Sequence, residues 1–356
     1  MGTLPSWGPP GEGANLWSAL ILLVSFGQIA LGVMVNLFSA ETPVPWGKFR
    51  SRAKPFWGPL VPTWAAWMFQ ELPSVLIPAA ILLWSQFCHG QLFNMIVVMA
   101  FTLHYLHRVF IYSLRHYRLP ESRRRDTVPI VLPLSAFMFC FANGIAQSLT
   151  GCYFNYSSEM RGFRYLFPNW APLKDGELEM LHKTNIWDTL ALFRFAFGLV
   201  IFFYGMAVNV SADEHLLQLK TVRAHDAVVP QAASSTSPKN QEGLVTLRRS
   251  SRIAAKKDGD NFVTFKYNAH PHGAGLTAYK IPRAGWFQQV SCANYWGEIC
   301  EWFGYAIMCN SVVAFSFALF TLLFLGRRGV QTHKWYKVRF GANYPENRRA
   351  VIPYVL

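Results

Sequence analysis

The chain has 356 residues, of which 52% are hydrophobic, 16% aromatic and only 15% charged. Its apolar residues form long runs, which excludes an ordinary soluble globular protein and indicates several helices in a lipid bilayer. The net charge of +14 could suit nucleic acid, but 27 of the 33 Lys and Arg residues fall in segments where membrane orientation requires them. We therefore expect no nucleic-acid partner.

Five apolar runs are each long enough to cross a hydrocarbon core of about 30 Å, which takes about 20 helical residues. They occupy residues 16–38, 61–84, 92–113, 128–150 and 186–209. A further run, 287–325, has no Lys or Arg and is too long for one helix, so we expect a break near Asn310 and a short last helix. The predicted fold class is an all-α integral-membrane bundle of seven transmembrane helices.

Basic residues concentrate in alternate segments between these runs, which fixes the predicted orientation. The positive-inside rule places the basic segments in the cytosol; they are 39–60, 115–127, 211–284 and 327–356. The N-terminus is then lumenal and the C-terminus cytosolic. Cys88 and Cys152 both fall on the lumenal side, where they could pair or remain free, and Asn155 begins a glycosylation sequon there. The six cysteines show no metal-type spacing, so no metal is expected.

The chain divides into three predicted regions. Residues 1–221 carry the first five helices and the substrate pocket. Residues 222–276 are polar and basic, with few large apolar side chains, and are predicted to be a disordered cytosolic insertion. Residues 277–356 carry the last two helices and the cytosolic tail that completes a cofactor site.

Ionisable residues inside a membrane are costly and therefore indicate function. Glu71 lies about ten residues from the cytosolic end of the second helix, hence roughly 15 Å deep. Tyr105 lies at nearly the same depth in the third helix, which runs the other way. Arg108 and Tyr112 follow Tyr105 on the same helical face, nearer the cytosol.

The sixth helix carries a polar stripe on one face. Its members are Asn294, Glu298, Glu301, Trp302 and Tyr305. Hydrogen bonding between helices is the structural alternative, but two carboxylates on one face favour a functional site. Asn209 and Asp213 share a face at the cytosolic end of the fifth helix, where a helix-capping role is the alternative. Arg194 could pair with Asp188, although that spacing is poor.

These positions predict a cavity that opens to the cytosol, with cytosolic loops closing over it. A carboxylate and a phenol lie deep inside, and cations that could hold phosphates lie nearer its mouth. The cations are Arg108, Lys220, Lys280, Arg283 and Lys334. No glycine-rich nucleotide fingerprint is present, so the bundle and its loops would have to hold any dinucleotide.

Several motifs extend across almost the whole chain. They are Gln70-Glu71-Leu72-Pro73-Ser74, His104-Tyr105-Leu106-His107-Arg108, Gly205-Met206-Ala207-Val208-Asn209, Tyr279-Lys280-Ile281-Pro282-Arg283, Asn294-Tyr295-Trp296-Gly297-Glu298, Glu301-Trp302-Phe303-Gly304-Tyr305 and His333-Lys334-Trp335-Tyr336. In these motifs the chain resembles the steroid 5α-reductase family. The resemblance implies a seven-helix enzyme of the endoplasmic-reticulum membrane that reduces Δ4-3-oxosteroids with NADPH.

The same resemblance implies a role for each matching residue. Glu71 and Tyr105 would be catalytic and bind the 3-keto oxygen, and Trp67 and Gln70 would line the pocket of a lipophilic steroid or sterol substrate. The implied NADPH-binding residues are Arg108, Asn209, Asp213, Lys220, Tyr279, Asn294, Glu298, Trp302, His333 and Tyr336.

The expected chemistry follows from the enone. A polarised carbonyl lets the double bond accept a hydride, and Tyr105 with a protonated Glu71 would stabilise the developing enolate. Three alternatives remain open: a sister reductase acting on enoyl-CoA or polyprenol, a non-catalytic sterol-binding protein, and a methyltransferase that binds S-adenosylmethionine instead of NADPH.

Overall fold

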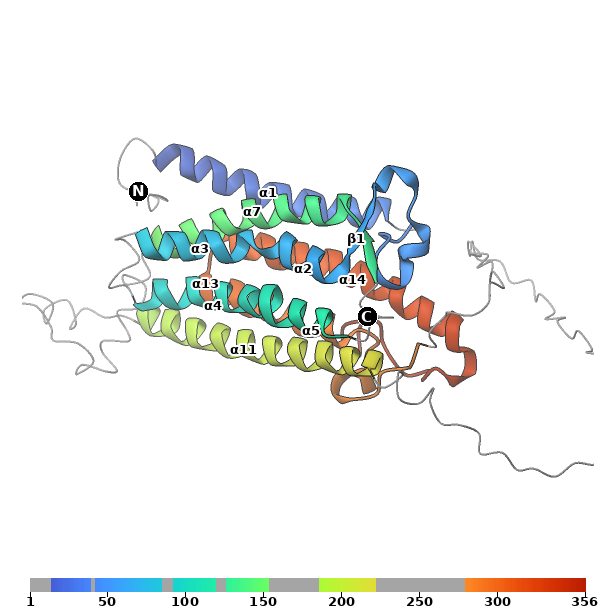
Figure 1. Ribbon diagram of the computed structural model, residues 1–356. Helices are drawn as coiled ribbons and strands as arrows, with labels where there is room; N and C mark the ends of the chain where they lie inside the picture. Colours follow the sequence, from blue (N-terminus) through green and yellow to red (C-terminus); the bar gives the residue numbers. More distant parts are fainter. Residues whose placement is uncertain (1–13, 40–41, 85–91, 120–125, 154–185, 222–278) are drawn as a thin grey trace, which may run out of the picture. The chain divides into compact units, whose positions relative to one another are not determined.

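The computed structural model describes residues 14–39, 42–84, 92–119, 126–153, 186–221 and 279–356. The chain divides into a compact unit, residues 1–224 with 281–356, and a second unit, 225–280. The first unit is a bundle of long helices that run alongside one another (Figure 1). The predicted insertion 222–276, together with Cys88 and Asn155, lies outside the described residues.

The bundle is formed by helices from both ends of the chain. The long helices are α1 (Ala14–Phe38), α4 (Leu92–Leu106), α7 (Val131–Tyr153), α11 (Ile186–Thr221), α13 (Ala293–Cys309) and α14 (Val312–Phe340), with the successive helices α2 (Thr63–Glu71) and α3 (Pro73–Trp84). The short elements are η1 (Gly47–Arg52), η2 (Pro55–Trp57), η3 (His107–Tyr112), α5 (Ser113–Tyr117), η5 (Gly285–Gln288), η6 (Gly341–Asn343) and the strands β1 (Leu60–Pro62) and β2 (Thr127–Pro129), which pair antiparallel.

Six helical stretches in the described residues have the length and hydropathy to cross a membrane. Five of them overlap the five predicted runs, and the sixth is Val312–Asn343. The prediction of an all-α membrane protein is thus confirmed. The remaining predicted span corresponds to α13, which has 17 residues and is not among the six, so the count of seven stays a prediction.

The predicted break at Asn310 is confirmed. Asn310 adopts a left-handed conformation with φ of 48° and ends α13, and the Ser311 side chain accepts a hydrogen bond from Ala314 N at 3.3 Å to start α14. The prediction of a short last helix is wrong, because α14 has 29 residues. No Pro interrupts it, and it stops only at Gly341, which has φ of 53°.

Glycines let α11 and α13 pack with their backbones in contact. A Cβ atom placed on Gly205 of α11 would lie 2.2 Å from the backbone nitrogen of Glu301, and one placed on Gly297 of α13 would lie 2.4 Å from that of Asn209. Small residues at a helix interface permit this close approach in membranes. The contact brings the predicted polar residues of the two helices together.

Arg328 of α14 holds the segment before η1 against the bundle. Its guanidinium donates to the carbonyls of Val44 and Trp46, each at 2.8 Å. It also lies over the rings of Trp46 and Phe49 at 4.4 and 4.5 Å. The side chain is only 5% exposed, so this contact connects the segment between α1 and α2 to the last helix.

Candidate active site

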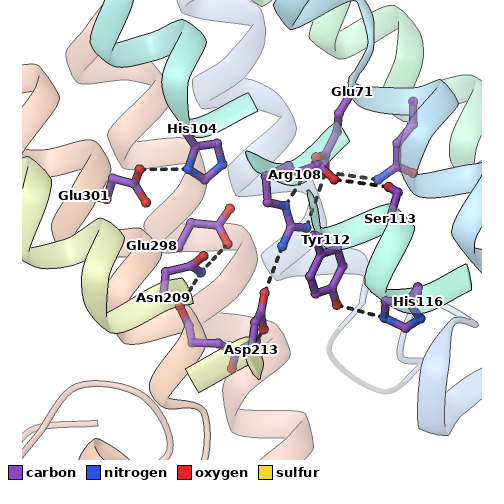
Figure 2. A network of polar contacts seen from close by, with 12 residues as sticks. Glu71, His104, Arg108, Tyr112, Ser113, His116, Asn209, Asp213, Glu298 and Glu301 are labelled. Atoms are coloured by element: carbon purple, nitrogen blue, oxygen red, sulfur yellow. Dashed lines mark hydrogen bonds and ion pairs between the residues drawn. The ribbon is translucent and has the colours of Figure 1, made fainter. Parts of the chain in front are cut away.

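Arg108 is the centre of a buried network that joins three helical segments. Its guanidinium contacts Glu71 of α2 at 3.3 and 3.4 Å and Asp213 of α11 at 3.0 Å (Figure 2). The planar group also lies over the rings of Trp67 and Tyr112, at 4.6 and 4.5 Å. All three charged residues are less than 9% exposed. Two carboxylates and two aromatic faces thus compensate one buried cation.

The backbone around Arg108 departs from the α-helix. Residues His107–Tyr112 form a π-helical segment, and the Ser113 hydroxyl donates to the Arg108 carbonyl at 3.1 Å, five residues back. Single π turns inside α-helices commonly occur at functional sites. The wider turn places Tyr112 beside the Arg108 guanidinium, and Tyr112 then contacts His116 at 3.2 Å.

Asp213 extends the network to the polar stripe of α13. Its second carboxylate oxygen accepts a hydrogen bond from Asn294 Nδ2 at 3.0 Å. Asn209 Nδ2 donates to the Asn294 carbonyl at 2.9 Å and to Glu298 Oε2 at 3.3 Å. The structure therefore brings together five of the predicted cofactor residues, counting Arg108, although their roles stay predictions.

The predicted catalytic pair sits beside this network, but its partners differ from those expected. Tyr105 is 6% exposed and shares a hydrogen bond with Ser74, whereas the described partners of the Glu71 carboxylate are Arg108 and Gln70. The physical reason is that a guanidinium offers a carboxylate two donors, and a phenol offers one. Gln70 lies next to Glu71 and Trp67 lies next to Arg108, and their role in a substrate pocket stays a prediction.

The remaining predicted residues lie in different surroundings. Trp302 is 1% exposed and belongs to the main aromatic core. Tyr336 stacks on Tyr344 near the C-terminal end of α14, with ring centroids 5.5 Å apart, and His333 Nδ1 lies 2.5 Å from the Ser291 hydroxyl. Lys220 lies 4.0 Å from the Asp126 carboxylate. Tyr279, 38% exposed, belongs to the second unit.

Arg194 of α11 contacts the end of α13. Its guanidinium donates to the carbonyls of Ile307 and, at 2.9 Å, Met308. These carbonyls belong to the last turn of α13, where they lack partners within the helix. The side chain of Asp188 lies outside the described residues, so the predicted pair is left untested.

One buried pair was not anticipated from the sequence. His104 Nδ1 of α4 lies 2.8 Å from Glu301 Oε1 of α13, and their side chains are 5% and 0% exposed. The ring of His104 packs against those of Trp302 and Tyr105, with centroids 4.7 and 5.0 Å apart. The only signal for this pair in the sequence is that each residue lies on a polar face of a membrane helix.

Comparison with known proteins identifies the family. A sequence profile described as 3-oxo-5-alpha-steroid 4-dehydrogenase matches residues 267–356. The chain is 31% identical to the "3-oxo-5-alpha-steroid 4-dehydrogenase 2" of Rattus norvegicus over 83% of this chain and 82% of that protein. It is 30% identical to the Sus scrofa protein of the same name, over 94% and 96%. The chain belongs to the steroid 5α-reductase family.

A further relative extends this membership to plants. The "Steroid 5-alpha-reductase DET2" of Gossypium hirsutum is 30% identical over 94% of this chain and 95% of that protein. The predicted resemblance is confirmed, and as a steroid 5α-reductase family member the chain is an oxidoreductase acting on CH–CH groups. The profile match includes α13, α14 and the C-terminal segment, where five predicted cofactor residues of the family pattern lie.

Proposed function

We propose that this protein reduces the Δ4 double bond of a 3-oxo-steroid or sterol-like enone. NADPH supplies the hydride to C5, and C4 takes a proton. The proposed setting is the endoplasmic-reticulum membrane, with α13 as the seventh span, a lumenal N-terminus and a cytosolic C-terminus. Family membership supports the substrate class, since the relatives are named for 3-oxo-5-alpha-steroids.

The observation that carries this proposal is the Arg108 bridge. Arg108 contacts Glu71, predicted for the substrate carbonyl, and Asp213, predicted for the cofactor, through the same guanidinium. Tyr105 precedes Arg108 by one helical turn and lies in the main hydrophobic core. A lipophilic substrate and a polar cofactor could therefore meet at one buried point, as reduction of an enone requires.

The described residues include polar and charged groups that could bind NADPH. Asn209, Asn294 and Asp213 supply amide and carboxylate groups for a carboxamide and ribose hydroxyls. At the cytosolic end, Arg348 is 4% exposed, and its Nε and Nη1 atoms have no hydrogen-bond partner among the described residues. Buried guanidinium donors without partners fit an anionic phosphate.

Tyr105 and Glu71 would act on the substrate carbonyl. As hydride reaches the β carbon, negative charge develops on the oxygen, and a neutral phenol donating a hydrogen bond there stabilises it. The contact with Arg108 keeps the Glu71 carboxyl at the same place, where it would need a proton to act as a second donor. The core residues around Tyr105 exclude water from the reacting atoms.

Two other functions differ from this one in the substrate that is reduced or in whether NADPH is oxidised. A sister reductase for enoyl-CoA or polyprenol would keep the NADPH requirement but not reduce a Δ4-3-oxosteroid. A sterol-binding protein would bind the steroid without oxidising NADPH. The network of Arg108, Asp213 and Asn294 favours an enzyme, because a passive lipid cavity gains nothing from buried charges.

A panel assay tests the proposal. Purified protein in lipid nanodiscs should oxidise NADPH only with Δ4-3-oxosteroids, giving the 5α-reduced product by mass spectrometry. Tyr105→Phe should lower this rate about 10²–10³-fold with NADPH affinity unchanged. Turnover with enoyl-CoA or polyprenol alone, or full activity of Tyr105→Phe, would reject the assignment.

A further inference from the structure

We propose that His104 and Glu301 form a proton-delivering pair, in which His104 protonates the α carbon of the substrate enolate and Glu301 positions its ring. This inference rests on the proposed function, because it concerns the proton consumed in the same reaction. Figure 2 shows the pair at the edge of the Arg108 network, with the second ring nitrogen of His104 turned away from Glu301 and toward Arg108.

The geometry requires a proton within the pair. His104 Nδ1 and Glu301 Oε1 are 2.8 Å apart, and two acceptor atoms meet at that distance only with a hydrogen between them. Glu301 is 0% exposed, and its other oxygen, Oε2, has no hydrogen-bond partner in the described part of the chain. A pair with zero net charge costs least to bury, and that form carries a second proton on Nε2 of His104.

The surroundings place this nitrogen among the charged groups of the candidate site. The charged groups that act on His104 are Glu298 of α13, Arg108 of the π segment, Glu71 of α2 and Asp213 of α11. These belong to the network predicted to hold the substrate carbonyl and the cofactor. The Glu301 carboxylate can then keep the Nδ1 proton and fix the ring, as a buried carboxylate does for a catalytic imidazole.

The reaction needs a proton donor for the α carbon of the substrate in addition to Tyr105. In the proposed reaction Tyr105 donates a hydrogen bond to the carbonyl oxygen, and the α carbon is two bonds from that oxygen. The donor for the α carbon must therefore stand beside Tyr105. His104 is the adjacent residue, with its ring centroid 5.0 Å from that of Tyr105, and Trp302 packs against both rings.

Protonation of the α carbon follows hydride transfer. Hydride adds to the β carbon, and the electron pair of the double bond moves onto the enolate. The α carbon then forms a C–H bond with the proton from Nε2, whose N–H electrons stay on His104. One proton from water restores the pair, so that each turnover consumes one hydride from NADPH and one proton.

Isotope effects on His104→Gln, Glu301→Gln and the control His107→Gln test this inference. His107 lies on the same helical stretch, is partly exposed, and has no described carboxylate partner. In His104→Gln the rate of single turnover should fall about 10²–10⁴-fold, as for loss of a general acid. The solvent deuterium isotope effect should rise, and the effect of 4-deuterated NADPH should shrink toward one, because protonation becomes the slow step.

Glu301→Gln should change both isotope effects in the same direction with a smaller loss of rate, because its amide oxygen still holds Nδ1–H but cannot neutralise the imidazolium. NADPH affinity, measured by fluorescence without substrate, should stay within twofold of wild type in all three variants. If both isotope effects keep their wild-type values in His104→Gln and Glu301→Gln, the inference is overturned. If the wild-type protein reduces no Δ4-3-oxosteroid, the proposed function itself fails.

Discussion

Arg108 shows how one residue can join two functions predicted for separate helices. Sequence reasoning placed Glu71, Tyr105 and Arg108 at related depths, but it could not predict the contacts of Arg108 with Glu71 and Asp213. Those partners are 37 and 105 residues away, and their meeting depends on how helices pack and on the π segment. His104 and Glu301, 197 residues apart, escaped prediction for the same reason.

Replacing Arg108 with Met should damage stability and cofactor binding together. It leaves two buried carboxylates without their cation, a change that costs about 3–5 kcal/mol. The control is Arg115→Met, because the ion pair of Arg115 with Glu214 is partly exposed and such pairs contribute about 0–1 kcal/mol. We expect a clear drop in the apo thermal midpoint and weak NADPH binding for Arg108→Met alone. Equal midpoints in the two variants would contradict the role of the bridge.

Lys48 offers a second test at the level of a single residue. Burial lowers the pKa of Lys48 from 10.5 to about 8, although its position over the Tyr336 and Trp335 rings, at 4.4 and 5.0 Å, favours the cation. With that pKa about half of the amine is neutral at pH 8, against about 0.3% for an ordinary lysine.

Lys48 should therefore react at pH 8 with a small acylating reagent, and its labelling should level off above that pH. NADPH should protect it if Tyr336 binds the cofactor. Peptide mass spectrometry measures both, with Lys48→Arg to verify the peptide. Labelling that keeps rising to pH 10 would disprove the lowered pKa, and labelling unaffected by saturating NADPH would remove Tyr336 from the cofactor site.

At the scale of helices, the lengths of the apolar runs predicted the membrane spans well. The irregular backbone within the helices could not be predicted in this way. Five spans and the break at Asn310 follow from hydropathy and from the missing basic residues. The π segment at His107–Tyr112 has no marker in the sequence, because the side chains there would also suit an α-helix. The length of α14 was predicted wrongly because its C-terminal half is polar, and hydropathy detects only the apolar half.

The glycine contact between α11 and α13 gives a prediction at this scale. Gly205→Ala should force the two helices apart, since its Cβ would lie 2.2 Å from a backbone nitrogen of α13. Asn209 would then lose contact with Glu298, which lowers NADPH affinity as well as the thermal midpoint. Gly27→Ala in α1 is the control, with no atom within 4 Å of its new Cβ. If both variants bind NADPH like wild type, close packing does not shape the site.

At the scale of the whole molecule, the Arg108 network and the His104–Glu301 pair lie within one compact unit, residues 1–224 and 281–356. The predicted insertion falls almost wholly in the other unit. Removing 222–276 and joining the ends by a flexible linker should leave a folded, active reductase, because changing loop length costs little. Turnover per correctly inserted molecule measures this. A deletion that inserts normally but does not reduce the substrate would show that the insertion contributes to the site.

The modest length of α13 also bears on which membrane suits the protein. Seventeen residues rise about 25 Å, and the helix ends at Asn310, with Arg194 binding its last carbonyls. A helix that ends this early matches a hydrocarbon layer of about 27 Å better than one of about 32–33 Å. If α13 spans the membrane as proposed, hydrophobic mismatch would favour the thinner bilayer of the endoplasmic reticulum over the plasma membrane.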